Sequence, residues 1–246
     1  MEEKVFSFVD LSEGDHEFAT FKYVGDDISN KICFCAVTPS SCSLFSTLTD
    51  ELNPVGFFII TINDIINTID YANGADPCPK FVRSFRNEVF KIGEVTIVLF
   101  ENPEICSKES VDAIFDLVKA EQIFVFSTIS KNLFKTDTES PKLYYIATKK
   151  SEENKRDLDS QNDNESKLPF PNRLENISAG LLILGEIKNI GVRVFQLVED
   201  PKGPTVESMS LLLGKMTKFI HFDIEKKAQQ ACHIANIRHS SSANIL

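Results

Sequence analysis

Four short and almost uninterrupted apolar runs constrain the fold of this chain more than any other feature. They are Lys31 to Val37, Val55 to Thr61, Gln122 to Ser127 and Val192 to Val198, and they are rich in β-branched and aromatic residues. A strand that is apolar at nearly every position must be covered on both faces, as in a parallel or mixed sheet between layers of helices. We therefore expect these runs to be strands of one covered sheet.

Further segments fit the outer part of such a sheet. Asn87 to Ile92 and Glu94 to Phe100 flank Gly93 and have the pattern of a hairpin. Val5 to Val9 and Phe18 to Val24 are candidates for edge strands. Because a hairpin pairs its strands antiparallel, the sheet is expected to be mixed.

Helical patterns alternate with the strands, with apolar residues three and four positions apart. The predicted helices have apolar positions at Leu44, Phe45, Leu48 and Leu52 after a cap at Ser40 or Ser41, at Val111, Ile114, Phe115 and Val118 after a cap at Ser107, at Val206, Met209, Leu213 and Met216 after Pro204, and at Ile224, Ala228, Ala231 and Ala235. A further helix, Asn176 to Lys188, is apolar almost all round, so we expect it to be buried on most of its surface. The alternation predicts an α/β fold with three layers, α/β/α, around a mixed, largely parallel central sheet.

The chain is expected to form one α/β domain over residues 1–237. Residues 151–167 include nine charged residues and one large apolar residue, Leu158, so this segment is predicted to be a mobile loop within the domain. The alternative is a linker between two domains. We disfavour it because the residues after the segment contain only one convincing strand. Residues 238–246 are small and polar until the last two, and are predicted to be a flexible tail.

The charge of the chain limits its partners. A net charge of −10 and a pI near 5.0 argue against binding to nucleic acid or to an anionic membrane surface, because both require a positive field. No apolar stretch approaches the roughly 18 residues that span a bilayer, and no signal peptide follows Met1. Six cysteines in a chain of 246 residues are not a disulfide framework, so the predicted compartment is the cytosol or nucleus.

Candidate reactive groups are few. Cys33 and Cys35 share a face of a strand and Cys42 follows nearby, but three thiols without a neighbouring histidine make an incomplete metal site, and buried cysteine is the commoner role. Cys232 and His233 could be a nucleophile and its base, but neighbours on a helix point about 100° apart. We therefore expect no catalytic, cofactor-binding or metal-binding residues, and no enzyme.

Two polar segments stand at predicted strand ends, where open α/β sheets bind ligands. Glu199 and Asp200 end one strand, and Thr38 to Ser41 enters a helix whose N-terminus could hold an anion. Acidic residues before Pro201 and Gly203 are also ordinary turn residues. These segments leave one enzymatic alternative open: a nucleoside-phosphorylase-like or hydrolase-like scaffold with a closed pocket near Thr38 and Asp200. If those two residues were at opposite edges of the sheet, this alternative would fail.

Read in order, several segments resemble the proteasome assembly chaperone family. The main stretch starts at Pro171-Asn172, continues through the apolar helix to Leu184, and resumes from Asn189 to Asp200 and from Thr205 to Leu213. Gly191 stands where the family often has proline. Ser110 to Asn132 is similar in sequence, and Lys31 to Leu52 is similar in layout.

The resemblance implies a chaperone without catalytic activity that forms a heterodimer with a paralogous subunit. The heterodimer would bind the outer face of the ring of α subunits of the 20S proteasome, promote its assembly and block premature docking of activators. The family's C-terminal tail can insert between α subunits, which implies ring binding by Asn244, Ile245 and Leu246. Ile245 occupies the position where the family has tyrosine, so the alternative is a tail end without this role.

Besides the enzyme, a generic adaptor with an unrelated client is a further alternative. The chaperone and the adaptor both predict an exposed apolar face for a partner and no pocket with converging titratable groups.

Overall fold

The structure is a computed structural model that describes residues 2–7, 18–64, 81–100, 107–138, 141–154 and 166–243. Its strands are β1 (Glu2–Ser7), β2 (Phe18–Gly25), β3 (Ile32–Ala36), β4 (Gly56–Asp64), β5 (Phe81–Ile92), β6 (Val95–Leu99), β7 (Gln122–Ser130), β8 (Lys142–Ala147), β9 (Ser166–Lys167) and β10 (Gly191–Glu199). Its helices are α1 (Pro39–Leu48), α2 (Ser107–Ala113) with a π-helical continuation over Ile114–Val118, α3 (Lys149–Glu153), α4 (Asn176–Lys188), α5 (Val206–Leu213) and α6 (Ile224–Ala243).

All of these strands form one mixed sheet in the order β1-β2-β4-β5-β6-β3-β7-β10-β8-β9. The four neighbours β6, β3, β7 and β10 are parallel, and so is the short pair β8 and β9. The other pairs are antiparallel, including the predicted hairpin of β5 and β6 around Gly93. The predicted α/β fold with a mixed sheet is confirmed, and parallel pairing is concentrated in its centre.

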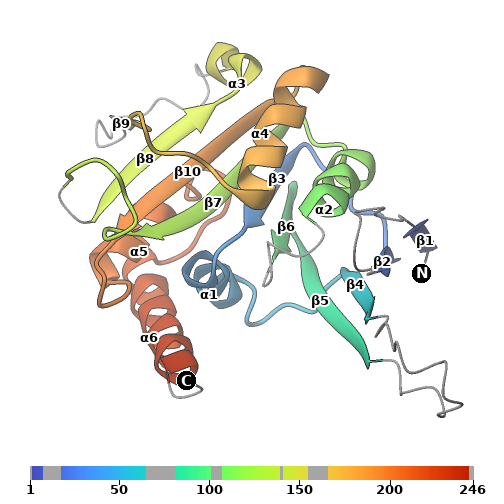
Figure 1. Cartoon of the computed structure of the whole chain (residues 1–246), viewed down its shortest axis with the longest axis horizontal. Coiled ribbons are helices and arrows are strands. Elements are labelled where there is room, and N and C mark those ends of the chain that lie inside the picture. Colours follow the sequence, from blue (N-terminus) through green and yellow to red (C-terminus); the bar gives the residue numbers. More distant parts are fainter. Residues whose placement is uncertain are drawn as a thin grey trace, which may run out of the picture.

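The two faces of the central strands bury different side chains. On β3, Cys33 and Cys35 pack in a cluster with residues of α2 and α4, whereas Phe34 packs in a second cluster with residues of α1, α5 and α6. Figure 1 shows α2 and α4 together in front of the central strands, with α5 behind the sheet. Helices on both faces explain why the central strands are apolar at nearly every position.

The core between the sheet and α1 is aromatic. Phe34 is fully buried and makes edge-to-face contacts with Phe45, Phe124, Phe126 and Phe219, at ring-centroid distances of 5.5 to 6.1 Å. Phenylalanine fills volume without a polar group that needs a partner, so these rings can pack without water.

Helix α4 approaches its neighbours closely because two of its residues are glycines. A Cβ atom on Gly185 would lie 2.3 Å from Cγ2 of Val192 on β10, and one on Gly180 would lie 2.8 Å from Cγ2 of Val111 on α2. Both positions would therefore clash with any larger residue. The glycines fix which side of α4 faces the protein.

The burial predicted for α4 is only partly right. Ile177 and Leu181 are fully buried against the sheet and α2, but Ile183 and Ile187 are 61% and 74% exposed. An amphipathic helix would have placed polar residues at these positions. The outer face of α4 thus exposes two isoleucines, beside the exposed Glu186 and Lys188, without a cover from the described part of the chain.

Other helix boundaries also differ from the sequence-based expectation. The N-cap of α1 is Thr38, and Ser41 accepts a hydrogen bond from its N–H at 3.0 Å instead of acting as the cap. Helix α1 ends at Leu48, so Leu52 lies beyond it and is 39% exposed. Ser107 is the first residue of α2.

Two charged or polar segments are more ordered than their composition suggests. The ends of the segment predicted as a loop, 151–167, belong to α3 and β9, and residues 155–165 lie outside the described part. Helix α6 continues to Ala243, so residues 238–243 of the predicted tail extend the helix. Ala228, Ala231 and Ala235 are buried as predicted, so this side of the helix packs against the core. The flexibility of the tail stays a prediction.

Strand β8 was not predicted. Its Leu-Tyr-Tyr-Ile centre has high β propensity, but lysines stand on both sides of it, at Lys142, Lys149 and Lys150. It pairs antiparallel with β10. Its residues Leu143 and Tyr145 are buried in the cluster that contains residues of α1, α5 and α6.

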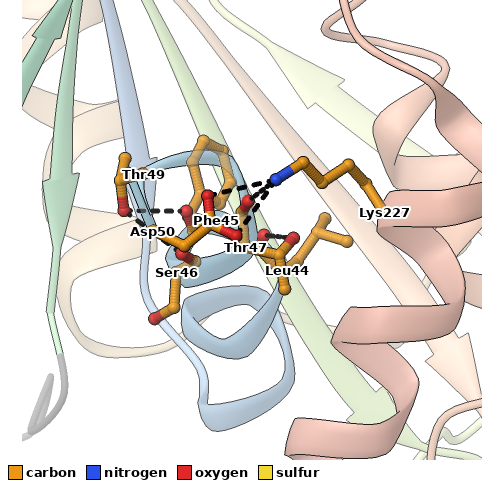
Figure 2. Close-up of polar contacts among 7 residues, drawn as sticks. All are labelled: Leu44, Phe45, Ser46, Thr47, Thr49, Asp50 and Lys227. Carbon is orange, nitrogen blue, oxygen red and sulfur yellow. Dashed lines mark hydrogen bonds and ion pairs between the residues drawn. The ribbon is translucent and has the colours of Figure 1, made fainter. Parts of the chain in front are cut away.

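A lysine on α6 holds the C-terminal end of α1. The Lys227 ammonium donates a hydrogen bond to the Thr47 carbonyl and lies 3.2 Å from both carboxylate oxygens of Asp50 (Figure 2). A cation here satisfies carbonyl groups that have no partner within the helix and opposes the negative end of its dipole. The contact fixes α6 against α1.

Replacing Lys227 with methionine should lower the free energy of unfolding by about 1 to 2 kcal/mol, because a carbonyl and a carboxylate lose their shared partner. Urea denaturation would measure this. The same change at the exposed neighbour Lys226 is the control, and it should leave stability within about 0.5 kcal/mol. Equal effects at the two positions would contradict the role assigned to Lys227.

Candidate functional site

A buried carboxyl group lies at the edge where the parallel strands end. Glu199 is the last residue of β10 and only 7% exposed. Its Oε2 accepts a hydrogen bond of 3.0 Å from Oγ of Ser40, in the first turn of α1. The two residues are 159 positions apart, and β7 between β3 and β10 brings their strand ends together.

The turn before α1 is tied to the same edge. Oγ1 of Thr38 lies 3.1 Å from Oγ1 of Thr128 on β7, and it accepts a hydrogen bond from the Thr128 N–H. Thr38 and Glu199 therefore lie on the same edge of the sheet, with Asp200 next to Glu199. Thr38 and Asp200 are thus not at opposite edges of the sheet, so the enzymatic alternative does not fail on that ground.

Burial raises the pKa of Glu199 to about 7, although hydrogen bonds from Ser40 and Thr128 act in the opposite direction. Its Oε1 has no hydrogen-bond partner among the described residues. A carboxylate with a buried, unpaired oxygen is costly to keep charged, so this group takes up a proton near neutral pH. Asp200, by contrast, is exposed and accepts a hydrogen bond from the Lys202 N–H, as in an ordinary turn.

The neighbouring thiol does not form a nucleophile pair. Sγ of Cys232 donates to the Pro204 carbonyl at 3.1 Å and accepts from the Asn236 amide at 3.4 Å, while His233 is exposed. Burial raises the pKa of the Cys232 thiol, and the nearby Glu199 charge adds to this. A raised thiol pKa lowers the fraction of the reactive thiolate. Cys232 and His233 are thus a half-buried thiol and a solvated imidazole.

Three cysteines that are close in sequence do not form one group in the structure. Cys33 and Cys35 have their sulfur atoms 3.7 Å apart in the cluster with α2 and α4, whereas Cys42 is buried on the opposite face of the sheet and donates to the carbonyl of Phe100. The mutual hydrogen bond and burial raise the pKa of Cys35 well above its usual value. Within the described ranges, no three His, Cys, Asp or Glu side chains are grouped as a metal site would require.

A hollow of about 370 Å³ lies at the other edge of the sheet, where the parallel strands begin. It is lined by Ser29, Asn30, Lys31, Glu94, Lys119 and Glu121. These charges are mixed in sign and exposed or half-buried, and the hollow is separate from Glu199. This hollow and the buried carboxyl group of Glu199 therefore do not belong to one site.

The described surface has apolar residues where a partner protein could bind. Ile183 and Ile187 are one turn apart on α4 and form what we call the α4 face. The sequence contains a signal for this face, because α4 is apolar almost all round although one side suffices to pack on the sheet. None of the described helices has the length and hydropathy to cross a bilayer.

The predicted ring-binding residues Asn244, Ile245 and Leu246 lie outside the described residues. Helix α6 leads to them and is described up to Ala243. Their role in binding therefore stays a prediction.

The fold matches solved structures over almost its whole length. PbaA of Pyrococcus furiosus, described as an archaeal homolog of proteasome-assembly chaperone, has a TM-score of 0.60 at 12% identity and covers 92% of this chain and 99% of its own. PbaB of the same organism, described as an archaeal proteasome activator, has a TM-score of 0.57 at 12% identity, with 90% and 98% covered. A proteasome-assembly chaperone homologue of Mycobacterium tuberculosis has a TM-score of 0.51 at 11% identity, with 85% and 94% covered.

By sequence, neither a protein-family model nor a curated protein matches the chain. The structural comparisons thus establish a fold shared with proteasome-assembly chaperone homologues.

Proposed function

We propose that this protein is a proteasome assembly chaperone without catalytic activity. It would form a heterodimer with a paralogous subunit in the cytosol or nucleus, bind the outer face of the α ring of the 20S proteasome, promote ring assembly and block premature docking of activators. The observation that carries the proposal is the match to PbaA over 92% of this chain and 99% of that one. From the segments that resemble the family we propose proteasome assembly chaperone 1, with the sister subunit, proteasome assembly chaperone 2, as the other candidate.

The α4 face supports pairing with a second subunit. Ile183 and Ile187 are neutral, exposed and held outward by the packing of Gly180 and Gly185 on the inner side. Interface cores are depleted in charge and rich in large apolar side chains. We assign the paralogous subunit to this face.

The C-terminal end supports a second contact, with the α ring. Helix α6 is anchored to α1 by Lys227 and extends toward Asn244, Ile245 and Leu246. The apolar residues Ile245 and Leu246 would enter a groove between α subunits, with Ile245 in place of an aromatic side chain.

Affinity purification with mass spectrometry tests this proposal, using the full chain and a version without residues 244–246. We expect the full chain to recover α subunits of the proteasome together with one α/β paralogue. The shortened chain should keep the paralogue and lose at least about 90% of the α subunits, since removing anchor residues costs about 2 kcal/mol or more, which exceeds a tenfold loss of affinity. Recovery of neither partner by the full chain would refute the proposal.

A further inference from the structure

Two loops at the edge of the sheet where Glu199 lies are joined by one asparagine. The first, residues 131–136, follows β7, and the second, residues 169–173, leads from β9 to α4. Oδ1 of Asn172 accepts a hydrogen bond of 2.7 Å from the Lys135 N–H, and its Nδ2 donates to Oγ1 of Thr136 at 2.7 Å. The same Nδ2 also donates to the Pro169 carbonyl at 3.0 Å. The side chain of Asn172 thus clamps the loops side by side.

The base of both loops is fixed by packing. Phe134 from the first loop stacks on Tyr144 of β8, with ring centroids 5.1 Å apart, and is 8% exposed. Leu168, just before the second loop, packs on the same cluster. Phe134 within the first loop is buried and Leu168 next to the second loop is half-buried, so both loops are attached to the same cluster at β8.

The outward side chains of these loops are large and apolar. Leu133 is 70% exposed and Phe170 is 92% exposed, the highest value among the exposed large apolar residues of the described chain. A phenylalanine that remains in water forgoes roughly 2 to 3 kcal/mol of burial free energy, and the packing just described prevents it from turning inward. We call residues 131–136 and 169–173 the clamped loops.

The clamped loops are positively charged within an acidic protein. They carry Lys131, Lys135 and Arg173, all exposed, and no acidic residue; the nearest acidic residues along the chain, Asp137 and Glu175, stand just outside them. None of the three cations forms an ion pair among those described. Asp137 and Glu175 offset part of this charge, so residues 131–137 and 169–175 together carry three cations and two carboxylates, a small positive balance in a chain of net charge −10.

We propose that the clamped loops are a docking site for an acidic segment of a partner protein that carries an exposed apolar side chain. Carboxylates of the segment would pair with Lys131, Lys135 and Arg173, and its apolar side chain would cover Leu133 and Phe170. The combination of apolar anchors with a polar, charged rim is that of a small protein interface. A nucleic acid fits less well, because three cations in a chain of net charge −10 release few counterions.

This site is separate from the α4 face and does not depend on the proposed function. The full-length protein can be tested on an array of peptides about twelve residues long, in which aspartate and glutamate surround a pair of apolar residues. A matched array has lysine at the acidic positions. Fluorescence polarisation with the best acidic peptide then gives affinities for the variants.

We expect the acidic array to bind and the lysine array not to bind, with affinity falling as salt is added. Phe170→Ala with Leu133→Ala, and separately Lys135→Glu with Arg173→Glu, should each weaken binding about tenfold or more. Ile237→Ala, an exposed apolar residue on α6, and Lys226→Glu, an exposed lysine on the same helix, are the matched controls and should bind as the unchanged protein does. Asn172→Ala should also weaken binding, although its side chain contacts the loops and not the peptide.

Thermal unfolding of each variant separates lost binding from lost folding. The substituted residues Leu133, Lys135, Phe170 and Arg173 are exposed, and only the fifth, Asn172, is half-buried. Equal binding of both arrays, no binding of either, or unchanged affinity in the loop variants would overturn the proposal. Binding of duplex DNA or anionic vesicles that depends on the same residues, without peptide binding, would overturn it as well.

Discussion

Changing both Ile183 and Ile187 to aspartate is expected to weaken the proposed pairing with a paralogous subunit at least about 100-fold, which corresponds to about 3 kcal/mol. The reason is that two carboxylates would be buried against an apolar surface with no cation to meet them. Because both side chains are 61% or more exposed in the single chain, the fold itself should be little affected.

Co-expression of the two subunits followed by size-exclusion chromatography measures the pairing. Ile237→Asp is the control, since Ile237 is 54% exposed on α6 and outside the α4 face. Circular dichroism and thermal unfolding should be alike for the double variant and this control. If the double variant pairs normally, or if Ile237→Asp disrupts pairing equally, the assignment of the α4 face is wrong.

Stability should depend on pH through Glu199, and the dependence should disappear in Glu199→Gln. The folded-state pKa of about 7 lies above the value of 4.5 expected for an unfolded chain. Protonation therefore stabilises the folded state fully below about pH 4.5, and this contribution is lost as pH rises through 7. The linked change is on the order of 3 kcal/mol between these limits.

Urea denaturation at pH 5 and pH 8 measures the change for the unaltered protein and for Glu199→Gln. The unaltered protein should lose more stability on going to pH 8 than the variant does, by up to about 3 kcal/mol. Glu207→Gln, which changes an exposed carboxyl on α5, should keep the pH dependence of the unaltered protein. Parallel pH profiles for Glu199→Gln and the unaltered protein would show that the carboxyl group is not held in the environment described.

The hydrophobic runs predicted the central strands because a strand that is buried on both faces must be apolar at nearly every position. Every position of β10 is buried, and the same is true of most of β7 and β3. Strand β8 was missed because it lies toward the edge, where flanking lysines can reach water and weaken the apolar pattern. Burial on both faces, and not strand propensity alone, made the strands predictable.

Contacts between distant segments were harder to predict. Glu199 was recognised as a polar residue at a strand end, but its bond to Ser40 depends on β3 and β10 both pairing with β7, which the sequence does not specify. The Asn172 clamp likewise joins segments about 36 residues apart in sequence, and its Pro-Asn pattern was noticed only as part of a family resemblance. The prediction that α4 is buried on most of its surface was only partly right, because an almost entirely apolar helix can be buried by its own chain or by another chain.

The central claim is that this chain assists assembly of the proteasome α ring. The direct measurement is to deplete the protein from its own cells and follow α-ring intermediates on native gels by blotting for α subunits. We expect free α subunits and incomplete rings to accumulate, and the full-length protein, but not the Ile183→Asp/Ile187→Asp variant, to restore complete rings. An unchanged distribution of α-subunit complexes after depletion would contradict the claim.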